Sequence, residues 1–163
     1  MNRNNVLVIG IIIGFIVGFF GTGQVCLLAE ETELQTLCNQ LNDFKRYEGK
    51  KIGYEETQSP SWEIGEKIVS YEEEAIPYLL DIYQNSDNLI AQLFAARLIG
   101  EIDFERGWKL LENFKDNERT IETIFNSSME TMTIGDVTRK ELVILQDQRK
   151  KTESTQSHRK SKI

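Results

Sequence analysis

The hydrophobic residues of this 163-residue chain recur three and four positions apart over most of residues 31–145. That spacing gathers apolar side chains on one face of an α-helix. Glycine, proline and clusters of small polar residues interrupt the pattern and mark its turns. The pattern therefore predicts a series of short helices, at about residues 31–46, 60–70, 74–83, 89–102, 108–114, 121–132 and 136–148, with a loop from 47 to 59.

Pro77, in the stretch EEEAIPYLLDIY, decides how two of these helices are divided. A proline inside a helix removes a hydrogen bond and costs about 3 kcal/mol. In the first turn its missing N–H costs little, and the three preceding glutamates complement the positive end of the helix dipole. We therefore predict that one helix ends near Ser70 and that the next begins at about Glu73 or Glu74.

The helices repeat when the chain is shifted by 31 residues. The shift places Trp62, Gly65, Ile68 and Tyr71 on Leu93, Ala96, Ile99 and Ile102, and Leu79, Leu80 and Tyr83 on Leu110, Leu111 and Phe114. A helix pair that recurs with a period of 20–50 residues is typical of a solenoid.

Two motifs identify a family that the repeated segment resembles. They are Ala75, Ile76, Pro77, Leu79 and Leu80, and then Ala95, Ala96, Ile99, Gly100, Glu101 and Ile102. With them, residues 62–116 resemble HEAT-like repeats of the short, bacterial, bilin-lyase-related kind. The chain departs from that family where Trp108 and Lys109 replace an apolar residue and a proline, and where Leu89–Ala91 lacks a basic residue.

The resemblance implies an all-α fold, a short α-solenoid of antiparallel helix pairs that follows an N-terminal hydrophobic helix. Because about three repeats are needed to bury a solenoid core, the helices at 31–46 and 120–148 are expected to cap the ends. A generic helical bundle is the alternative. In the family, partners are recognised on the concave surface of the second helices, which here points to Gln92 and Arg97 as exposed positions. Enzymes such as bilin lyases share these repeats and leave a minor enzymatic alternative.

Residues 6–20 form an apolar run without a polar side chain, preceded by Arg3. The run spans about 22 Å as a helix, which is short of the ~30 Å hydrocarbon core of a membrane. It fits a cleaved secretory signal, with small residues at 21–23, or an anchor extended to Ala29. Gly10, Gly14 and Gly18 form a stripe suited to close packing of two transmembrane helices, which favours the anchor and suggests a homodimer through it.

The charges on either side of this segment predict its orientation. Arg3 precedes it, and Glu30, Glu31 and Glu33 follow it, which favours the N-terminus inside and the C-terminal domain outside. We therefore predict a single-pass membrane protein, with a periplasmic or secreted protein as the alternative. The predicted domains are an anchor or signal at 1–29, a repeat domain at 30–148 and a basic tail at 149–163.

Charge argues against a nucleic-acid partner. Residues 30–145 hold 12 Lys and Arg against 24 Asp and Glu, whereas the last 18 residues hold six against two. Binding to nucleic acid depends mostly on neutralising phosphates, which an acidic body does poorly. The tail is polar and almost free of apolar residues, so we predict that it is disordered.

The sequence contains little that could support catalysis. Its single histidine, His158, lies in the predicted tail, which leaves no histidine triad or histidine metal site. Cys26 and Cys38 have no CxxC spacing; they could pair after signal cleavage, or Cys38 could be a core residue. No glycine-rich phosphate loop follows a strand pattern. We expect no catalytic centre, metal or cofactor.

Trp62 and Trp108 lie near predicted helix starts. Tryptophan is a favoured anchor of protein interfaces, although core packing is the more common role. The sequence therefore predicts a non-enzymatic scaffold that binds a protein partner, with Trp62, Gln92, Arg97 and Trp108 as the candidate contact residues.

Overall fold

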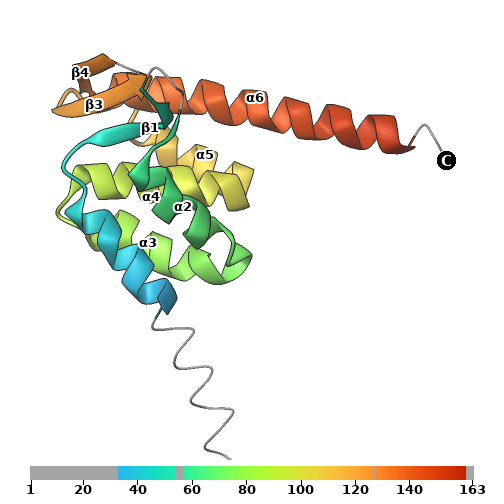
Figure 1. The fold of residues 1–163 in the computed structure, drawn as a ribbon, viewed down its shortest axis with the longest axis horizontal. Helices are drawn as coiled ribbons and strands as arrows, with labels where there is room; N and C mark the ends of the chain where they lie inside the picture. Colours follow the sequence, from blue (N-terminus) through green and yellow to red (C-terminus); the bar gives the residue numbers. More distant parts are fainter. Residues whose placement is uncertain (1–32, 54–56, 127, 161–163) are drawn as a thin grey trace, which may run out of the picture. The chain divides into compact units, whose positions relative to one another are not determined.

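A computed structural model describes residues 33–53, 57–126 and 128–160 of the chain (Figure 1). Contacts divide the chain into two units, Met1–Thr36 and Leu37–Ile163. The sheet and the labelled helices discussed below all belong to the second unit.

The prediction of an all-α solenoid is wrong, because the chain forms a mixed α/β fold around a four-stranded sheet. After helical residues 33–40, the helices are η1 (Leu41–Asp43), α2 (Pro60–Val69), η2 (Glu72–Ala75), α3 (Ile76–Asn85), α4 (Leu89–Ile102), α5 (Phe104–Glu112) and α6 (Ile134–Lys160). The strands are β1 (Tyr47–Ile52), β2 (Thr57–Gln58), β3 (Thr120–Asn126) and β4 (Ser128–Thr133). The resemblance of the helical segment to HEAT-like repeats stays a prediction.

The strand order across the sheet is β2-β1-β3-β4. β1 and β3 are parallel, with Tyr47 opposite Thr123 and Glu48 opposite Ile124, and the two outer pairs are antiparallel. A parallel pair needs a long crossover connection, which α2 to α5 provide here. The helical segment thus connects two neighbouring strands of one sheet.

The β3–β4 hairpin replaces the helix that was predicted for residues 121–132. β3 is rich in β-branched residues and alternates in burial, with Thr123 buried between the half-buried Ile121 and Phe125. That period of two is the strand pattern. Apolar positions three and four apart, such as Ile121, Ile124 and Phe125, fit the helical period equally well and misled the prediction.

Two predicted helix starts, those of α2 and α3, are confirmed. The Ser59 hydroxyl accepts a hydrogen bond from the Trp62 N–H, so Ser59 caps α2 with Pro60 as its first residue. A 3-10 turn at 72–75 separates α2 from α3, which places Pro77 at the second position of α3. Pro77 therefore marks a helix start, as its context predicts.

α4 forms the centre of the core and contacts η1, α2, α3, α5 and α6. Nearly all its residues from Ile90 to Gly100 are buried. The Phe94 ring meets the rings of Phe44, Tyr47 and Trp62 edge to face, with centroids 5.3, 5.8 and 5.2 Å away. Edge-to-face contacts of this kind stabilise aromatic clusters, and this one joins the sheet to α2 and α4.

α4 and α5 cross at two glycines. A Cβ added at Gly107 would overlap the backbone of Gly100, which leaves no room for any side chain there. Small residues in α4, including Ala96 and Gly100, let α5 approach closely at this point.

The prediction of a single-pass transmembrane protein is corrected. Within residues 33–53, 57–126 and 128–160, no helix combines the length and the hydrophobicity needed to cross a membrane. The segment on which the prediction rested, residues 1–29 with Gly10, Gly14 and Gly18, lies outside the described residues. The function proposed below does not depend on a membrane.

α6 is longer than the sequence pattern suggested. It begins at Ile134 rather than Asp136, and it continues to Lys160, into the range predicted to be a disordered tail. Its start is capped by a reciprocal pair, in which the Thr133 hydroxyl donates to the Asp136 carboxylate and accepts from the Asp136 N–H.

Cys38, before the sheet, is a free and buried thiol, while Cys26 lies outside the described residues.

Candidate functional site

Two adjoining surface hollows run along α5 towards α6, and we call them together the α5–α6 groove. The first has a volume of about 630 Å³ and reaches from Ile76 and Pro77 to Arg106. The second has a volume of about 420 Å³ and includes Trp108 and Lys150. Both hollows are lined by Phe104, Glu105 and Arg149, so the groove is continuous at these three residues.

An aromatic pair lies at the centre of the groove. Phe104 and Trp108 are four residues apart on α5, which places them on one helix face, and their ring centroids are 5.5 Å apart. The Asp103 carboxylate caps this helix by accepting from the Arg106 N–H at 3.1 Å. Both rings are half-buried, so each keeps a surface for a partner to contact.

Arg149 of α6 lies over Phe104, one ring of the aromatic pair. Its guanidinium carbon lies 4.5 Å from the Phe104 centroid, a cation–π distance. Its nitrogens also bond Glu105 at 2.6 Å and Glu153 at 2.9 Å. Hydrogen bonds to Glu153 and Glu105 raise the pKa of Arg149 above its ordinary value. These contacts hold a planar, permanently charged group against the groove.

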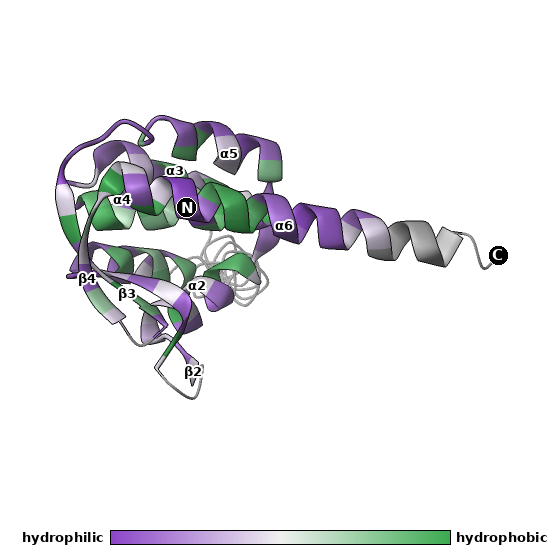
Figure 2. Cartoon of the chain, turned by 90° about the horizontal axis from the view of Figure 1, so that it is seen from above, coloured by the Kyte–Doolittle hydropathy of each residue, from purple (hydrophilic) through white to green (hydrophobic). Residues whose placement is uncertain are grey.

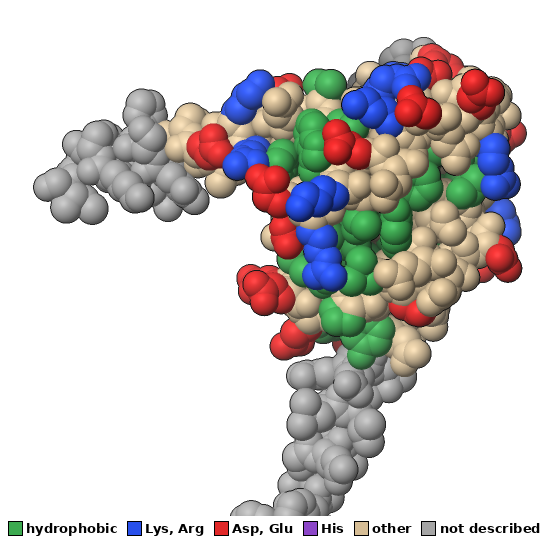
Figure 3. Space-filling model, turned by 180° about the vertical axis from the view of Figure 1, so that it is seen from behind, with side chains coloured by type: hydrophobic (Ala, Val, Ile, Leu, Met, Phe, Trp, Pro, Cys, Tyr) green, Lys and Arg blue, Asp and Glu red, His purple; other side chains and the backbone are tan. Residues whose placement is uncertain are grey.

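The rim of the groove carries charges of both signs, including Glu73, Asp103, Arg106 and Lys150. On the face opposite to that of Figure 1, hydrophobic side chains gather between basic and acidic ones (Figure 3). An apolar centre within a polar rim is the usual anatomy of a protein interface.

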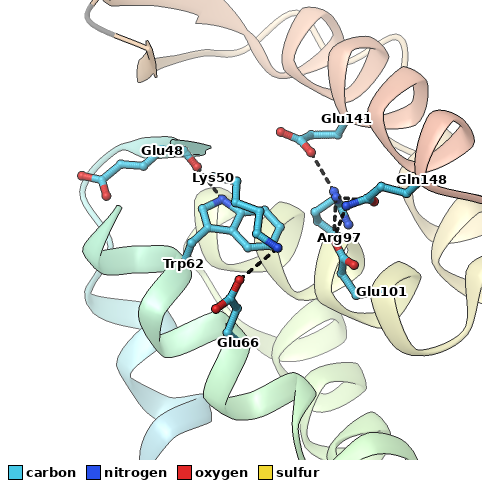
Figure 4. A network of polar contacts seen from close by, with 8 residues as sticks. All are labelled: Glu48, Lys50, Trp62, Glu66, Arg97, Glu101, Glu141 and Gln148. Atoms are coloured by element: carbon cyan, nitrogen blue, oxygen red, sulfur yellow. Dashed lines mark hydrogen bonds and ion pairs between the residues drawn. The ribbon is translucent and has the colours of Figure 1, made fainter. Parts of the chain in front are cut away.

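A buried ion network connects α4 to α6 behind this surface (Figure 4). Arg97 is only 1% exposed and bonds the Glu141 carboxylate at 2.7 Å and the Glu101 carboxylate at 2.8 Å. Gln148 accepts from Arg97 at 3.1 Å and donates to Glu101 at 3.1 Å. Burial by itself would lower the pKa of Arg97, but the charges of Glu141 and Glu101 raise it above its ordinary value.

The network fixes the helix that carries Arg149. Gln148 points towards Arg97, and the next residue, Arg149, points towards Phe104 and Glu105. Because four polar groups fix the rotation of α6 at Gln148, the guanidinium of Arg149 is held in place over the groove. We assign Arg97 and Glu141 a positioning role.

Trp62 lies on the other side of Arg97. Its indole N–H donates to the Glu48 carbonyl at 3.0 Å, and the Arg97 guanidinium lies 5.1 Å from its ring centroid. Lys50 lies 5.3 Å from the same ring and pairs with Glu66 at 3.0 Å. Hydrogen bonds to Gln58 and Lys50 lower the pKa of Glu66. Trp62 is therefore a core residue that joins β1, α2 and α4.

The structure separates the four residues that the sequence suggested as partner contacts. Trp62 and Arg97 are each 1% exposed and meet in the core, so the expectation that Arg97 is an exposed position was wrong. Gln92 is half-buried and donates to the Ser86 carbonyl at 2.6 Å. Trp108 alone of the four lies in the groove. Gly10, Gly14 and Gly18 lie outside the described residues.

Sequence reasoning missed Phe104 and Arg149. The four-residue spacing of Phe104 and Trp108 was available, but the segment around Phe104 was interpreted as a turn. Arg149 was assigned to the tail, and nothing local in the sequence pairs it with α5.

The groove is lined by acidic and basic side chains, among them Glu73, Asp103 and Lys150. Its lining residues include no histidine, cysteine, serine or threonine, and Glu105 and Glu153 are both paired with Arg149. No cluster of His, Cys, Asp or Glu within the described parts of the chain is placed to hold a metal ion. The arrangement is suited to binding by shape and charge.

Tyr47 is a buried residue whose ionisation the fold disfavours. Its hydroxyl lies near the Glu141 carboxylate but makes no hydrogen bond of good geometry, and Nη1 of Arg97 makes none either. Burial, and then the charge of Glu141, raise the pKa of Tyr47 well above 10.0. Burial also raises the pKa of the Cys38 thiol from 9.0 to about 12. At pH values at which both groups would ionise in the unfolded chain, both are still neutral in the folded protein.

Alkaline pH is expected to destabilise the protein. Because both folded pKa values are raised, their contributions to stability are complete below pH 9.0 and are lost progressively as pH rises above 9.0 for Cys38 and above 10.0 for Tyr47. Tyr47→Phe should leave stability at pH 7 unchanged or raise it by up to about 1 kcal/mol, because a hydroxyl without a hydrogen bond of good geometry is removed.

Urea unfolding at pH 7 and at about pH 11 tests whether Tyr47 contributes to the loss of stability at alkaline pH. Tyr47→Phe should lose less stability between the two conditions than the wild type does. Tyr78→Phe, at a half-buried position on α3, is the control and should follow the wild type. Equal losses in all three proteins would contradict the assignment.

No protein-family model matches this chain, and no curated protein matches it either.

Proposed function

We propose that this chain is a non-enzymatic adaptor that binds a segment of a protein partner in the α5–α6 groove. The observation that carries the proposal is the half-buried pair of Phe104 and Trp108, with the guanidinium of Arg149 over Phe104. Tryptophan and arginine dominate the energetics of protein interfaces, especially in pockets ringed by weaker contacts.

Rigid walls support this proposal. α5 packs on α4 through Gly107 and Gly100, and α6 is held to α4 by the ion pair of Arg97 with Glu141. A partner would therefore meet surfaces whose geometry is already set, which reduces the entropy lost on binding.

The groove also indicates the chemistry of its partner. An apolar or aromatic side chain would fill the space beside Trp108, next to Phe104. Charged residues on either side of that anchor would meet Glu73 and Asp103 in one hollow and Lys150 in the other. The expected ligand is thus a short protein segment with one large apolar residue between charged ones.

Trp108→Ala is expected to weaken binding to such a partner by about 10- to 100-fold, because a central tryptophan is worth roughly 2 kcal/mol or more. Partners captured by the immobilised full chain would be purified, and their dissociation constants measured for the wild type and the variant. Phe104→Ala should cause a comparable loss, because it removes the second ring.

Val143→Ala, at an exposed apolar position on α6 outside the groove, is the matched control and should bind as the wild type does. Circular dichroism and thermal unfolding would confirm that all variants are folded. If every purified partner bound Trp108→Ala and Phe104→Ala within twofold of the wild type, the groove would not be the binding site.

A further inference from the structure

β4 forms an open edge of the sheet. Among the described residues it pairs with β3 alone, and its first four residues, 128–131, are exposed. The backbone groups that point away from β3 are therefore available to another strand. The opposite edge is β2, which has only two residues and offers little for pairing.

This edge lacks the features that usually prevent strand pairing. Natural edges are blunted by proline, bulges or several charges. β4 has no proline and one charged residue, Glu130. Its pairing with β3 runs without a shift from Thr120 opposite Thr133 to Phe125 opposite Ser128. The edge is regular over six residues, or about 20 Å at the usual rise of a strand.

Exposed apolar side chains belong to β4 and to α6, the helix that follows it. Among the described residues, the large hydrophobic side chains that are exposed are Met129, Val143 and Ile144, with exposed fractions of 63%, 59% and 41%. Met129 belongs to β4, and the other two belong to α6, which directly follows β4. Figure 2 shows a hydrophobic stretch in the first half of α6. α6 lies against the hairpin, because the Lys140 ammonium is 3.5 Å from the Met132 sulfur and 4.5 Å from the Phe125 centroid. We call the edge of β4 with Val143 and Ile144 the β4–α6 face.

We infer that the β4–α6 face pairs two copies of this chain, with β4 of one copy antiparallel to β4 of the other. A twofold axis at Thr131 places Thr131 opposite its own copy, Met129 opposite Thr133 and Glu130 opposite Met132. No like charges then face each other, and threonine pairs are favourable across strands. An axis at Glu130 would oppose two carboxylates, so the charges favour Thr131 over Glu130 as the position of the axis.

The area needed for a stable dimer explains the exposed residues of α6. A specific interface buries about 800 Å² on each partner, which is more than one short strand supplies. Val143 and Ile144 add apolar surface beside the strand. An extended peptide from another protein would need only the strand edge, so a contribution from these two residues distinguishes a second copy from a peptide.

Sedimentation equilibrium of the full chain over a range of concentrations tests the inference. We expect a reversible dimer whose dissociation constant rises at least tenfold in Thr131→Lys, because two ammonium groups would meet at the axis. The variant should remain folded, because Glu122 lies opposite Thr131 on β3 and can pair with the new lysine. Val143→Ser with Ile144→Ser should also weaken the dimer. Trp108→Ala should leave it unchanged, because it lies in the α5–α6 groove.

A disulfide test gives independent support. In the proposed register the two Thr131 residues lie within reach of a disulfide, so Thr131→Cys should form a covalent dimer on mild oxidation. Glu122→Cys, one strand further from the axis, should not, because its copies would be about 14 Å apart at the usual strand spacing. A monomeric wild-type chain, a dimer equally stable in Thr131→Lys, or equal cross-linking of the two cysteine variants would each overturn the inference.

Discussion

Gly107→Ala is expected to destabilise the fold by about 3 kcal/mol or more, although alanine is the better helix former. Helix propensity alone would favour alanine over glycine by about 1 kcal/mol. At this position, however, the added methyl group would overlap the backbone of Gly100 and lie 3.0 Å from the Ala96 carbonyl oxygen. Backbone atoms cannot avoid the overlap by a rotamer change, as a side chain can, so α4 and α5 would have to separate.

The thermal midpoint measures this effect directly. A loss of about 3 kcal/mol in a domain of this size lowers the midpoint by roughly 10 °C. Gly100→Ala is the matched control, because its methyl group would meet the flexible end of the Leu145 side chain at 2.8 Å. It should cost clearly less than Gly107→Ala. A neutral or stabilising Gly107→Ala would mean that the two helices do not cross this closely.

The helix crossing illustrates what local sequence can predict. Ala96 and Gly100 are small residues on a helix with an unambiguous apolar pattern, so their sequence alone indicates where a neighbouring helix can approach closely. The starts of α2 and α3 were predictable for the same reason, since Ser59, Pro60 and Pro77 act through their own backbone. Such features depend on neighbouring residues alone.

The sheet depends on partners that are distant in the sequence. β1 contains Gly49 and was interpreted as part of a loop, yet the glycine fits the strand, because a Cβ there would lie 2.9 Å from the Phe125 ring. β3 lies more than 70 residues further along, and its strand conformation is stabilised by pairing with β1. No local pattern reveals a parallel pairing across four helices.

The candidate site was likewise only partly predictable. Trp108 was identified from its residue type, but Arg149 reaches Phe104 only because α6 folds back on α5. Arg97 was taken for an exposed residue because charged side chains are rarely buried. Its neighbours in the segment LFAARLIG are all apolar, which in retrospect indicates a buried position that needs an ion partner.

Arg97→Met is expected to destabilise the protein by about 3–5 kcal/mol, the usual result of removing one partner from a buried ion pair. Methionine has a similar length, so the loss comes mainly from Glu141, which is 2% exposed and would remain charged without a partner. Urea unfolding at neutral pH would measure the loss of stability relative to the wild type.

The double variant Arg97→Met, Glu141→Leu separates charge from packing. If the buried charge causes the loss, the double variant should recover most of the stability, because apolar replacements of a buried pair are often neutral. Arg139→Met, an exposed arginine on α6 that pairs with Asp136 at 2.7 Å, is the control and should change stability by about 1 kcal/mol or less.

Partner binding gives a second measurement of the same network. Because Gln148 bonds Arg97 and the adjacent Arg149 covers the groove, the double variant should bind partners more weakly than the wild type even where its stability is restored. Full recovery of both stability and binding would show that Arg97 contributes only to packing. Recovery of stability alone would support its role in positioning α6 over Phe104 and Trp108.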